Sequence, residues 1–312
     1  MNVLLWHVHG SWTTSFVQGG HRYLIPTLPR RGPDGLGRAA TWNWPDSAIE
    51  VTPAEAAEAT VEAVVLQRPH ELDGLAERWL GGRRPGRDVP AIYLEHNAPQ
   101  GRIADMRHPA ADRDDLLLVH VTHFNSLFWN AGSTATTVVE HGIVDPGYRY
   151  RGNLERAAVA VNEPVRRGRV TGTDLLDVFA SVVPLDLFGI GAGALGGTED
   201  PPQQALHDAL VQRRIYLHPI RWTSLGLSLL EAMHLGMPIV ALATTEVTEA
   251  VPPEAGVVSN RFEVLLESLR RLCRDPEEAR LRGKAAREAA LARYGLGRFL
   301  AGWDDVLGRV CR

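Results

Sequence analysis

Short apolar runs alternate with longer stretches of helix-forming residues along the whole chain. In the first half, the apolar runs span residues 3–8, 63–67, 91–94, 116–121 and 136–139, and polar residues close each one. In the second half, runs at 157–161, 185–190, 215–217 and 239–243 accompany helical patterns at 228–235, 260–274, 276–294 and 299–310. Apolar runs of this length are typical of strands buried in a parallel sheet. The pattern therefore predicts a doubly wound α/β fold, whose ligands bind beyond the carboxyl ends of the strands.

Local signals mark where several elements begin. Thr52, Pro53 and Glu55 form a capping box with proline at the first helical position, which predicts a helix running to about Thr60. Gly10 and Ser11 follow the first strand and predict a turn, so Gly10 is a candidate for a ligand-binding loop at the strand end. Without a G-x-G-x-x-G pattern, a simple turn is an equal alternative.

The segment 215–243 contains the clearest functional pattern. It predicts a strand at 215–217, a polar turn through Thr223, Ser224 and Gly226, a helix at 228–235 closed by Gly236, and a second strand. The turn places unpaired backbone N–H groups at a helix N-terminus, and such groups favour an anion such as phosphate.

One carboxylate, Glu231, lies in the first turns of this helix, which should be largely buried. It has two explanations. The carboxylate can simply complement the helix dipole, or it can accept hydrogen bonds from ribose hydroxyls while phosphates occupy the N–H groups. Because the phosphate loop lies immediately upstream, we favour the second explanation.

Residues 221–241, RWTSLGLSLLEAMHLGMPIVA, resemble the donor-site signature of family-4 (group 1) retaining glycosyltransferases. Glu231 matches the second glutamate of the E-x7-E motif of that family. The first glutamate falls on Thr223, and the glycine after it falls on Ser224. The resemblance implies a GT-B fold, with nucleotide-sugar contacts at Thr223, Ser224, Leu225, Gly226, Leu227 and Glu231. It also implies a retained ribose site and an altered sugar site.

A basic segment at 162–176 resembles the family pattern G-R-L-x-x-x-K-G-x-D-L-L. The lysine position is Thr171, so the available cations are Arg166, Arg167 and Arg169, which the resemblance assigns to the diphosphate. The alternative is a solvated basic turn. Gly191 lies in a second glycine loop, a candidate for base or phosphate binding, and only about 25 residues separate that loop from Ile215, which predicts a trimmed domain.

Nine of the twelve histidines lie in the first half, several of them at strand ends. His7 and His9 share one strand face, so a metal site is possible, but a polar cleft is the commoner arrangement and we expect no metal. The segment 67–71, QRPHE, resembles the family segment whose histidine reaches the reacting sugar, which implies that role for His70. The segments 93–97 and 138–145 resemble, more loosely, the T-x-H strand end and the run before the interdomain linker.

A long loop at 30–46 carries Trp42 and Trp44. The family often binds its acceptor in this region, so the resemblance makes both tryptophans candidates for a sugar or lipid platform. Filling a gap in the core is an equally good explanation.

Length and composition indicate the number of domains and limit the kinds of partner and location. The 312 residues predict two domains, at 1–150 and 151–296, and the resemblance implies that a last helix at 297–312 crosses back to the first domain. A net charge of −4 without a basic tail disfavours nucleic acid as a partner. Cys273 and Cys311 are expected to be reduced thiols. No apolar run reaches membrane-spanning length and no signal peptide is recognisable, so we expect a cytoplasmic protein.

Taken with the resemblance, these features predict a metal-independent hexosyl- or heptosyltransferase without a cofactor. A nucleotide diphosphate sugar would be its co-substrate, and its acceptor would be an unidentified small molecule, glycan or lipid. Because Thr223 and Thr171 replace the first glutamate and the lysine, a non-catalytic nucleotide-sugar-binding subunit is an alternative. A related GT-B phosphorylase or epimerase is another.

Overall fold

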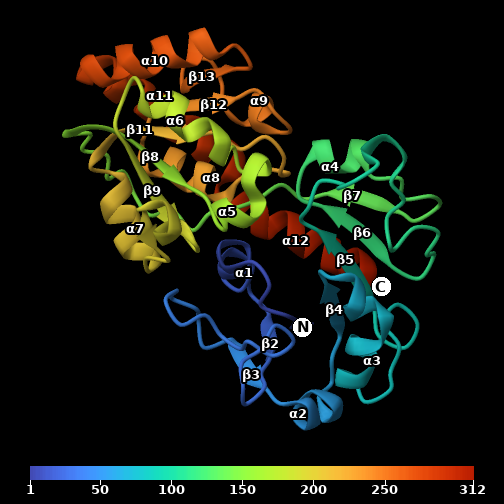
Figure 1. Cartoon of the computed structure of the whole chain (residues 1–312). Helices are drawn as coiled ribbons and strands as arrows, with labels where there is room; N and C mark the ends of the chain where they lie inside the picture. Colours follow the sequence, from blue (N-terminus) through green and yellow to red (C-terminus); the bar gives the residue numbers. More distant parts are fainter. The chain divides into compact units, whose positions relative to one another are not determined.

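The computed structural model describes all 312 residues. They form two compact units, the first comprising Met1–Val144 and Leu296–Arg312 and the second Asp145–Gly295. Each unit contains one sheet of parallel strands with helices packed around it (Figure 1). The predicted doubly wound α/β fold is therefore confirmed.

The sheet of unit 1 has the order β3-β2-β1-β4-β5-β6-β7. Its strands are β1 (Asn2–Leu5), β2 (Arg22–Pro26), β3 (Ala48–Val51), β4 (Ala63–Leu66), β5 (Ala91–Glu95), β6 (Leu117–His120) and β7 (Thr136–Val138). Its helices are α1 (Gly10–Phe16), α2 (Pro53–Glu58), α3 (Ala76–Trp79), α4 (His123–Phe128) and α12 (Leu296–Val310). The strand order reverses between β1 and β4, and crevices at such switch points are where open α/β sheets bind ligands.

Local sequence signals explain two of these helices. In α2, the Thr52 side chain accepts from the backbone N–H of Glu55, and the Glu55 carboxylate accepts from the Thr52 N–H at 2.7 Å, which confirms the capping box. The predicted turn at Gly10 and Ser11 is wrong, because α1 begins at Gly10. Trp12 and Phe16 lie one helical turn apart and are both buried, so they give this segment an apolar face that favours a helix.

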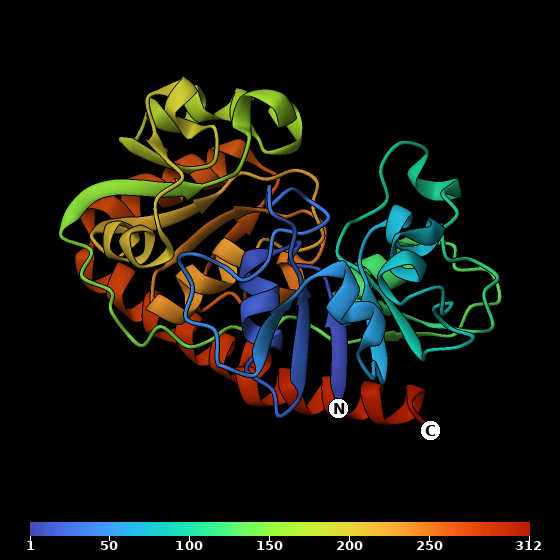
Figure 2. The same cartoon turned by 90° about the horizontal axis from the view of Figure 1, so that it is seen from below.

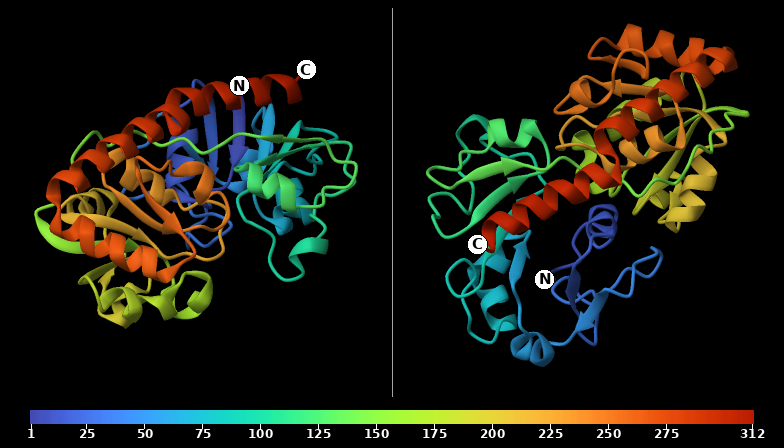
Figure 3. Two further views of the ribbon diagram at one scale, coloured as in Figure 1. Left: turned by 90° about the horizontal axis from the view of Figure 1, so that it is seen from above. Right: turned by 180° about the vertical axis from the view of Figure 1, so that it is seen from behind.

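An aromatic cluster attaches α12 to α1 within unit 1. The ring of Trp12 lies 5.5 Å from that of Trp303, and Phe16 lies 5.0 Å from Trp303. Figures 2 and 3 show that the two chain termini lie close together along α12. Glu62 contacts residues near both ends of the chain. Its side chain accepts a hydrogen bond from the Asn2 N–H, and its backbone carbonyl accepts one from the Cys311 thiol.

The sheet of unit 2 has the order β10-β9-β8-β11-β12-β13. Its strands are β8 (Leu154–Ala160), β9 (Leu185–Gly189), β10 (Thr198–Glu199), β11 (Arg213–His218), β12 (Ile239–Leu242) and β13 (Gly256–Ser259). Its helices are α5 (Pro164–Arg167), α6 (Leu176–Ala180), α7 (Gln203–Leu210), α8 (Leu227–Leu235), α9 (Val247–Ala250), α10 (Phe262–Arg274) and α11 (Pro276–Tyr294). The switch point of this sheet lies between β8 and β11.

Alternate residues of β11 contact helices on opposite faces of the unit 2 sheet. Ile215 and Leu217 of β11 pack with Leu265 and Leu269 of α10 on one face of the sheet. Tyr216 points to the other face, where its hydroxyl bonds to Ser228 of α8. The edge strand β10 has only two residues, and with α7 it occupies the stretch between the second glycine loop and β11. The trimming of this domain stays a prediction.

Candidate functional site

Helix α8 begins in unit 2 with uncapped backbone N–H groups. Gly226 is its N-cap residue and has an extended conformation, and no side chain caps the first turn. At the other end, Gly236 has a φ of +87°, which confirms the predicted glycine C-cap. Because α8 follows β11, its N-terminus lies beside the switch point of the sheet, where free N–H groups and the helix dipole favour an anion.

His218, the last residue of β11, lies beneath this loop and was not singled out in the sequence. A Cβ atom on Gly226 would lie 2.6 Å from Cε1 of His218, so the ring packs directly against the glycine. Both ring nitrogens are buried without a hydrogen-bond partner. Burial lowers the pKa of His218 to about 4, so the imidazole is neutral at physiological pH. This close approach explains why residue 226 is glycine.

Glu231 is buried in α8, with 4% of its surface exposed. Its Oε2 accepts a hydrogen bond of 2.7 Å from Nε2 of Gln203 and lies 3.4 Å from Nε2 of His207. Both partners belong to α7, whose pattern gave no functional signal in the sequence. Helix α7 therefore holds the Glu231 carboxylate in place through the side chains of Gln203 and His207.

The other predicted donor-loop residues surround the start of α8. Ser224 and Leu225 are buried, whereas Thr223 and Leu227 are half-buried. The Ser224 carbonyl accepts from the N–H of Glu246 at 3.4 Å. The structure therefore places this loop at the N-terminus of α8, with Glu231 one turn further along the helix.

The basic segment lies next to this loop. The backbone N–H of Arg221 donates to the carbonyl of Val170 at 2.9 Å, and the Arg221 guanidinium binds Asp174. Arg169 binds the same carboxylate at 2.9 Å. The predicted cations are therefore brought beside the predicted phosphate loop by contacts within unit 2.

The three predicted cations differ in their partners. Arg166 pairs with Glu163, and Arg169 pairs with Asp174. Arg167 is half-buried and forms no ion pair, and burial lowers its pKa, with the nearby charge of Arg166 adding to the effect. Arg167 is thus the cation of this group that forms no ion pair, although the nearby Glu163 partly offsets the lowering of its pKa.

Two other predicted positions have internal partners. Gly191 has a φ of +77°, and its N–H donates to the Glu199 carboxylate at 2.7 Å. The Gly193 N–H donates to the same carboxylate, and these bonds lower the pKa of Glu199. Thr171, at the family's lysine position, is buried and donates to the Gly168 carbonyl. The N–H of Gly191 and the hydroxyl of Thr171 therefore both form hydrogen bonds within the chain.

In unit 1, histidines gather beyond the strand ends. His9 follows β1, His96 follows β5 and His141 follows β7, and the rings of His9 and His96 lie 4.1 Å apart. Burial lowers the pKa of His9 to about 4 and that of His141 to about 3. Burial, together with His9 and His141, also lowers the pKa of His96. These three residues form the histidine cluster, which is uncharged at neutral pH.

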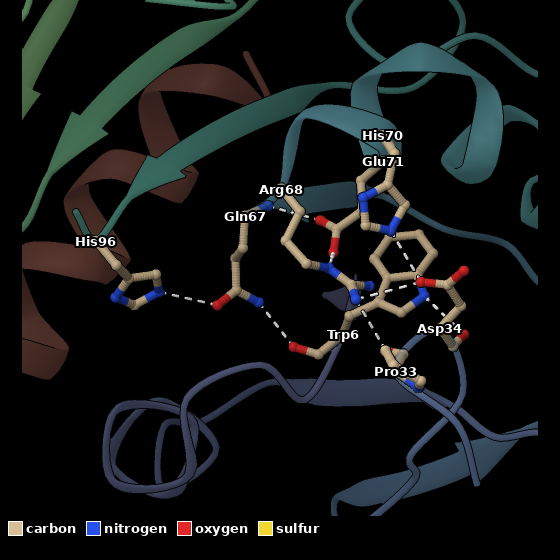
Figure 4. A network of polar contacts seen from close by, with 8 residues as sticks. All are labelled: Trp6, Pro33, Asp34, Gln67, Arg68, His70, Glu71 and His96. Atoms are coloured by element: carbon tan, nitrogen blue, oxygen red, sulfur yellow. Dashed lines mark hydrogen bonds and ion pairs between the residues drawn. The ribbon is translucent and has the colours of Figure 1, made fainter. Parts of the chain in front are cut away.

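His70 lies apart from His96, the member of this cluster that Figure 4 draws. Its side chain is half-exposed, and Nε2 lies 2.8 Å from Oδ1 of Asp34. Arg68 binds the same carboxylate at 3.2 Å and the buried Glu71 at 2.5 Å. Burial raises the pKa of Glu71, although Arg68 opposes that shift. These contacts attach the 30–46 loop to the end of β4.

The two tryptophans of that loop have different environments. Trp44 is buried, and its Nε1 donates to the Thr14 hydroxyl at 2.7 Å, so this ring fills the core of unit 1. Trp42 is half-buried and covers Gly10, where an added Cβ would lie 3.4 Å from Nε1 of the indole. Trp42 is therefore the better candidate for a platform, and Gly10 is covered by it.

The structure contains no group of three or more histidine, cysteine, aspartate or glutamate residues able to hold a metal ion. No helix is both long and apolar enough to cross a membrane. Cys273 and Cys311 are free thiols.

Comparison with known proteins adds two findings. Residues 198–289 match the model of the family described as glycosyl transferases group 1, and this range includes α7, the loop and α8. No curated protein sequence matches the chain.

Solved structures resemble nearly the whole chain. Sucrose-phosphate synthase from Thermosynechococcus elongatus superposes with a TM-score of 0.74 at 13% identity, covering 99% of this chain and 98% of that one. HepE from Anabaena, in complex with UDP-glucose, gives 0.69 at 13% identity over 99% and 100%. A glycosyltransferase from Rickettsia africae gives 0.63 at 10% identity over 100% and 98%.

The chain has the GT-B fold. At these identities the superpositions show the fold alone, and the family match covers the donor-loop region of unit 2. Within this region, the structure places Glu231 one turn past the N-terminus of α8.

Proposed function

We propose that this protein is a glycosyltransferase that moves a sugar from a nucleotide diphosphate sugar to an acceptor, with retention at the anomeric carbon. The observation that carries the proposal is the family match at residues 198–289, within which Glu231 is buried one turn past an uncapped helix N-terminus. The complexes of HepE with UDP and UDP-glucose support a donor of this class.

In this proposal unit 2 binds the donor. Glu231 accepts hydrogen bonds from the ribose hydroxyls, and the N–H groups at the start of α8 bind phosphate oxygens. Arg166, Arg167 and Arg169 neutralise the departing diphosphate. Because helix N–H groups and arginines supply this charge stabilisation, the mechanism requires no metal ion.

Retention by attack on the same face of the sugar leaves little work for a protein base. His70 therefore orients or polarises the reacting sugar in this proposal and forms no covalent bond with it. Thr223 replaces an anion with one neutral hydroxyl, so the sugar-binding part of the site differs from that of the family. A hexose lacking one hydroxyl, or a heptose, fits this change.

One observation favours a second candidate, a non-catalytic nucleotide-sugar-binding subunit. Thr171, at the lysine position, is committed to hydrogen bonds with Gly168 and Thr173, and Thr223 cannot act as a carboxylate. In that case the chain would bind a nucleotide sugar without transferring the sugar.

Thermal stabilisation by a panel of nucleotide sugars, followed by NMR analysis of the products formed from the stabilising donor, separates the two candidates. We expect stabilisation by at least one donor and a product with the donor's anomeric configuration. Stabilisation without consumption of any donor would identify the binding subunit, and an inverted product would contradict retention.

A further inference from the structure

A cavity of about 430 Å³ lies in unit 2 beside the strand β9. The two-residue strand β10 pairs with only the last two residues of β9, so no strand lies beside Leu185–Leu187 on their outer side. This stretch lines the cavity together with Leu176 of α6 and with Gly196 and Gly197, which lead into β10. The cavity volume is in the range that is usual for small-molecule sites.

The cavity is separate from the proposed donor site. None of the residues predicted to contact the nucleotide sugar or its diphosphate lines it. Arg213, which does line it, is the first residue of β11. His218, the last residue of the same strand, packs beneath Gly226 of the donor loop. The cavity and the donor loop therefore contact opposite ends of β11.

Two arginines of this cavity share one carboxylate. Arg156 of β8 donates to both oxygens of Asp186, at 2.7 and 2.9 Å, and Nε of Arg213 donates to the same carboxylate at 2.7 Å. Burial would raise the pKa of Asp186, but the hydrogen bonds from Arg156 and Arg213 hold it below its ordinary value. Asp186 therefore stays ionised and offsets only one of the two positive charges.

Each arginine keeps one terminal nitrogen that forms no hydrogen bond within the chain. In Arg213, Nη1 donates to the carbonyl of Ala209, so Nη2 remains. In Arg156, Nε and Nη2 contact Asp186 and the Leu185 carbonyl, so Nη1 remains. The two arginine side chains are 40% and 19% exposed, so a ligand in the cavity can reach both. Guanidinium N–H groups fit the oxygens of a carboxylate.

The other lining residues restrict the ligand further. Leu176, Leu185 and Leu187 offer apolar surface to an uncharged part of the ligand. Asp177 of α6 also lines the cavity, is exposed and forms no ion pair, so its charge disfavours a ligand with several negative charges. A single carboxylate on a small apolar body therefore fits this cavity better than a phosphate ester or a nucleotide.

We propose that this cavity is a second ligand site of unit 2, which binds a small organic monocarboxylate at Arg156 and Arg213 and regulates the donor site through α7. Arg213 provides the connection, because its Nη1 donates at 2.8 Å to Ala209 in the last turn of α7. Gln203, the first residue of the same helix, holds Glu231. The regulatory role rests on the proposed function, whereas binding of the carboxylate does not.

Benzoate and benzamide test the binding, because they have nearly the same shape and only benzoate is charged. In nitrogen-15 NMR titrations of the labelled chain, benzoate should shift the backbone signals of Leu185–Leu187 and of Gly196 and Gly197, and benzamide should not. Phenyl phosphate should bind more weakly than benzoate. The proposal would be overturned if benzoate shifted none of these signals, if benzamide bound equally well, or if phenyl phosphate bound more tightly.

Two variants test the position of the ligand. Arg156→Gln should weaken benzoate binding about tenfold, since a charged donor is lost while Arg213 still binds Asp186. Arg270→Gln on α10 is the charge-matched control and should bind benzoate normally. Ala180→Phe covers the case that Arg156→Gln folds poorly. Ala180 is exposed and lines the cavity, so a ring there should obstruct it without changing any charge. Wild-type benzoate affinity in folded Ala180→Phe would contradict the proposal.

A second titration separates a failure of the regulatory role from a failure of the proposed function. With saturating benzoate, the affinity for the nucleoside diphosphate of the identified donor should change at least about fivefold. The diphosphate should change the affinity for benzoate by the same factor, and Gln203→Ala should abolish this coupling. If both ligands bind independently, the regulatory role is refuted. If no nucleotide binds, the proposed function fails, and the benzoate titrations still decide whether the cavity is a ligand site.

Discussion

The side-chain amide of Gln203 donates a 2.7 Å hydrogen bond to Oε2 of Glu231, so the start of α7 fixes the buried carboxylate of α8. A carboxylate held in this way presents a defined geometry to vicinal hydroxyls and loses little conformational freedom on binding. The two residues should therefore act as one unit in nucleotide recognition, although they lie 28 positions apart.

Removal of the carboxylate should weaken nucleotide binding. Glu231→Ala is expected to cost about 1.5–3 kcal/mol in binding of the nucleoside diphosphate, because the lost hydrogen bonds involve a charged acceptor. Calorimetric titration measures this cost, and circular dichroism checks the fold. Wild-type affinity in a folded variant would remove Glu231 from the site.

Gln203 should matter only through Glu231. Gln203→Ala should weaken binding of the nucleoside diphosphate about three- to tenfold in the wild type and have no effect in the Glu231→Ala background. Gln204→Ala, at the exposed neighbour, is the control and should bind normally. Additive losses from Gln203→Ala and Glu231→Ala would show that the glutamine acts independently.

The arginines should distinguish the diphosphate from the rest of the nucleotide. Replacing Arg166 and Arg169 together with glutamine should lower affinity for a nucleoside diphosphate at least tenfold more than affinity for the corresponding nucleoside, because only the diphosphate carries the charge they neutralise. Arg167→Gln should behave in the same way on its own, since Arg167 forms no ion pair. Arg270→Gln on α10 is the charge-matched control. Equal losses for both ligands would support the solvated-turn interpretation.

Thr223 should set donor preference. The neutral hydroxyl of Thr223 makes a weaker hydrogen bond than a carboxylate would, of about 0.5–1.5 kcal/mol. When the sugar lacks the matching hydroxyl, Thr223 leaves no buried charge without a partner, whereas a glutamate would. We therefore expect the wild type to use a deoxy or heptose donor at least as well as UDP-glucose, and Thr223→Glu to shift kcat/KM towards UDP-glucose. If the wild type already prefers UDP-glucose and the variant only improves it, the altered-sugar hypothesis fails.

Buried neutral histidines should make the fold sensitive to acid. His120 and His218 are fully buried, and burial lowers the pKa of each to about 4. Between the ordinary value near 6.5 and about 4, the unfolded chain binds protons that the native protein does not bind, so stability falls as pH falls. Each such group contributes about 1.4 kcal/mol per pH unit in this window.

Urea unfolding of wild type and His120→Phe between pH 7 and 4.5 measures this effect. As the pH falls, the free energy of unfolding of the variant should decrease less steeply than that of the wild type. The difference between the two slopes should equal the contribution of one histidine. His123→Phe, at an exposed histidine of α4, should keep the wild-type slope. Parallel slopes for wild type and His120→Phe would contradict the account.

The sequence predicted elements whose signals are local. The α8 helix was recognisable because its pattern, loop and closing Gly236 lie within one stretch, and α2 was recognisable from the capping box at Thr52. The α1 helix was missed because Gly10 and Ser11 favour a turn, whereas burial of Trp12 against Trp303, far along the chain, favours the helix. Packing between distant segments has no local signature.

The same limit applies to the site. The motif around Glu231 indicated a carboxylate of interest but not its partners, because Gln203 and His207 are on a different helix. Likewise, the basic segment showed three arginines but not that Glu163 and Asp174 pair with two of them. His70 was chosen by motif, and its pairing with Asp34 depends on the course of the 30–46 loop. Its catalytic role stays a prediction.

The most direct test of the central claim is a comparison of kcat/KM for sugar release from the best nucleotide-sugar donor between the wild type and Glu231→Ala. The account predicts measurable turnover by the wild type and a loss of at least tenfold in the folded variant, because Glu231 would anchor the nucleotide in unit 2. Equal kcat/KM for the two proteins, or no sugar release by a wild type that binds the donor, would contradict the claim.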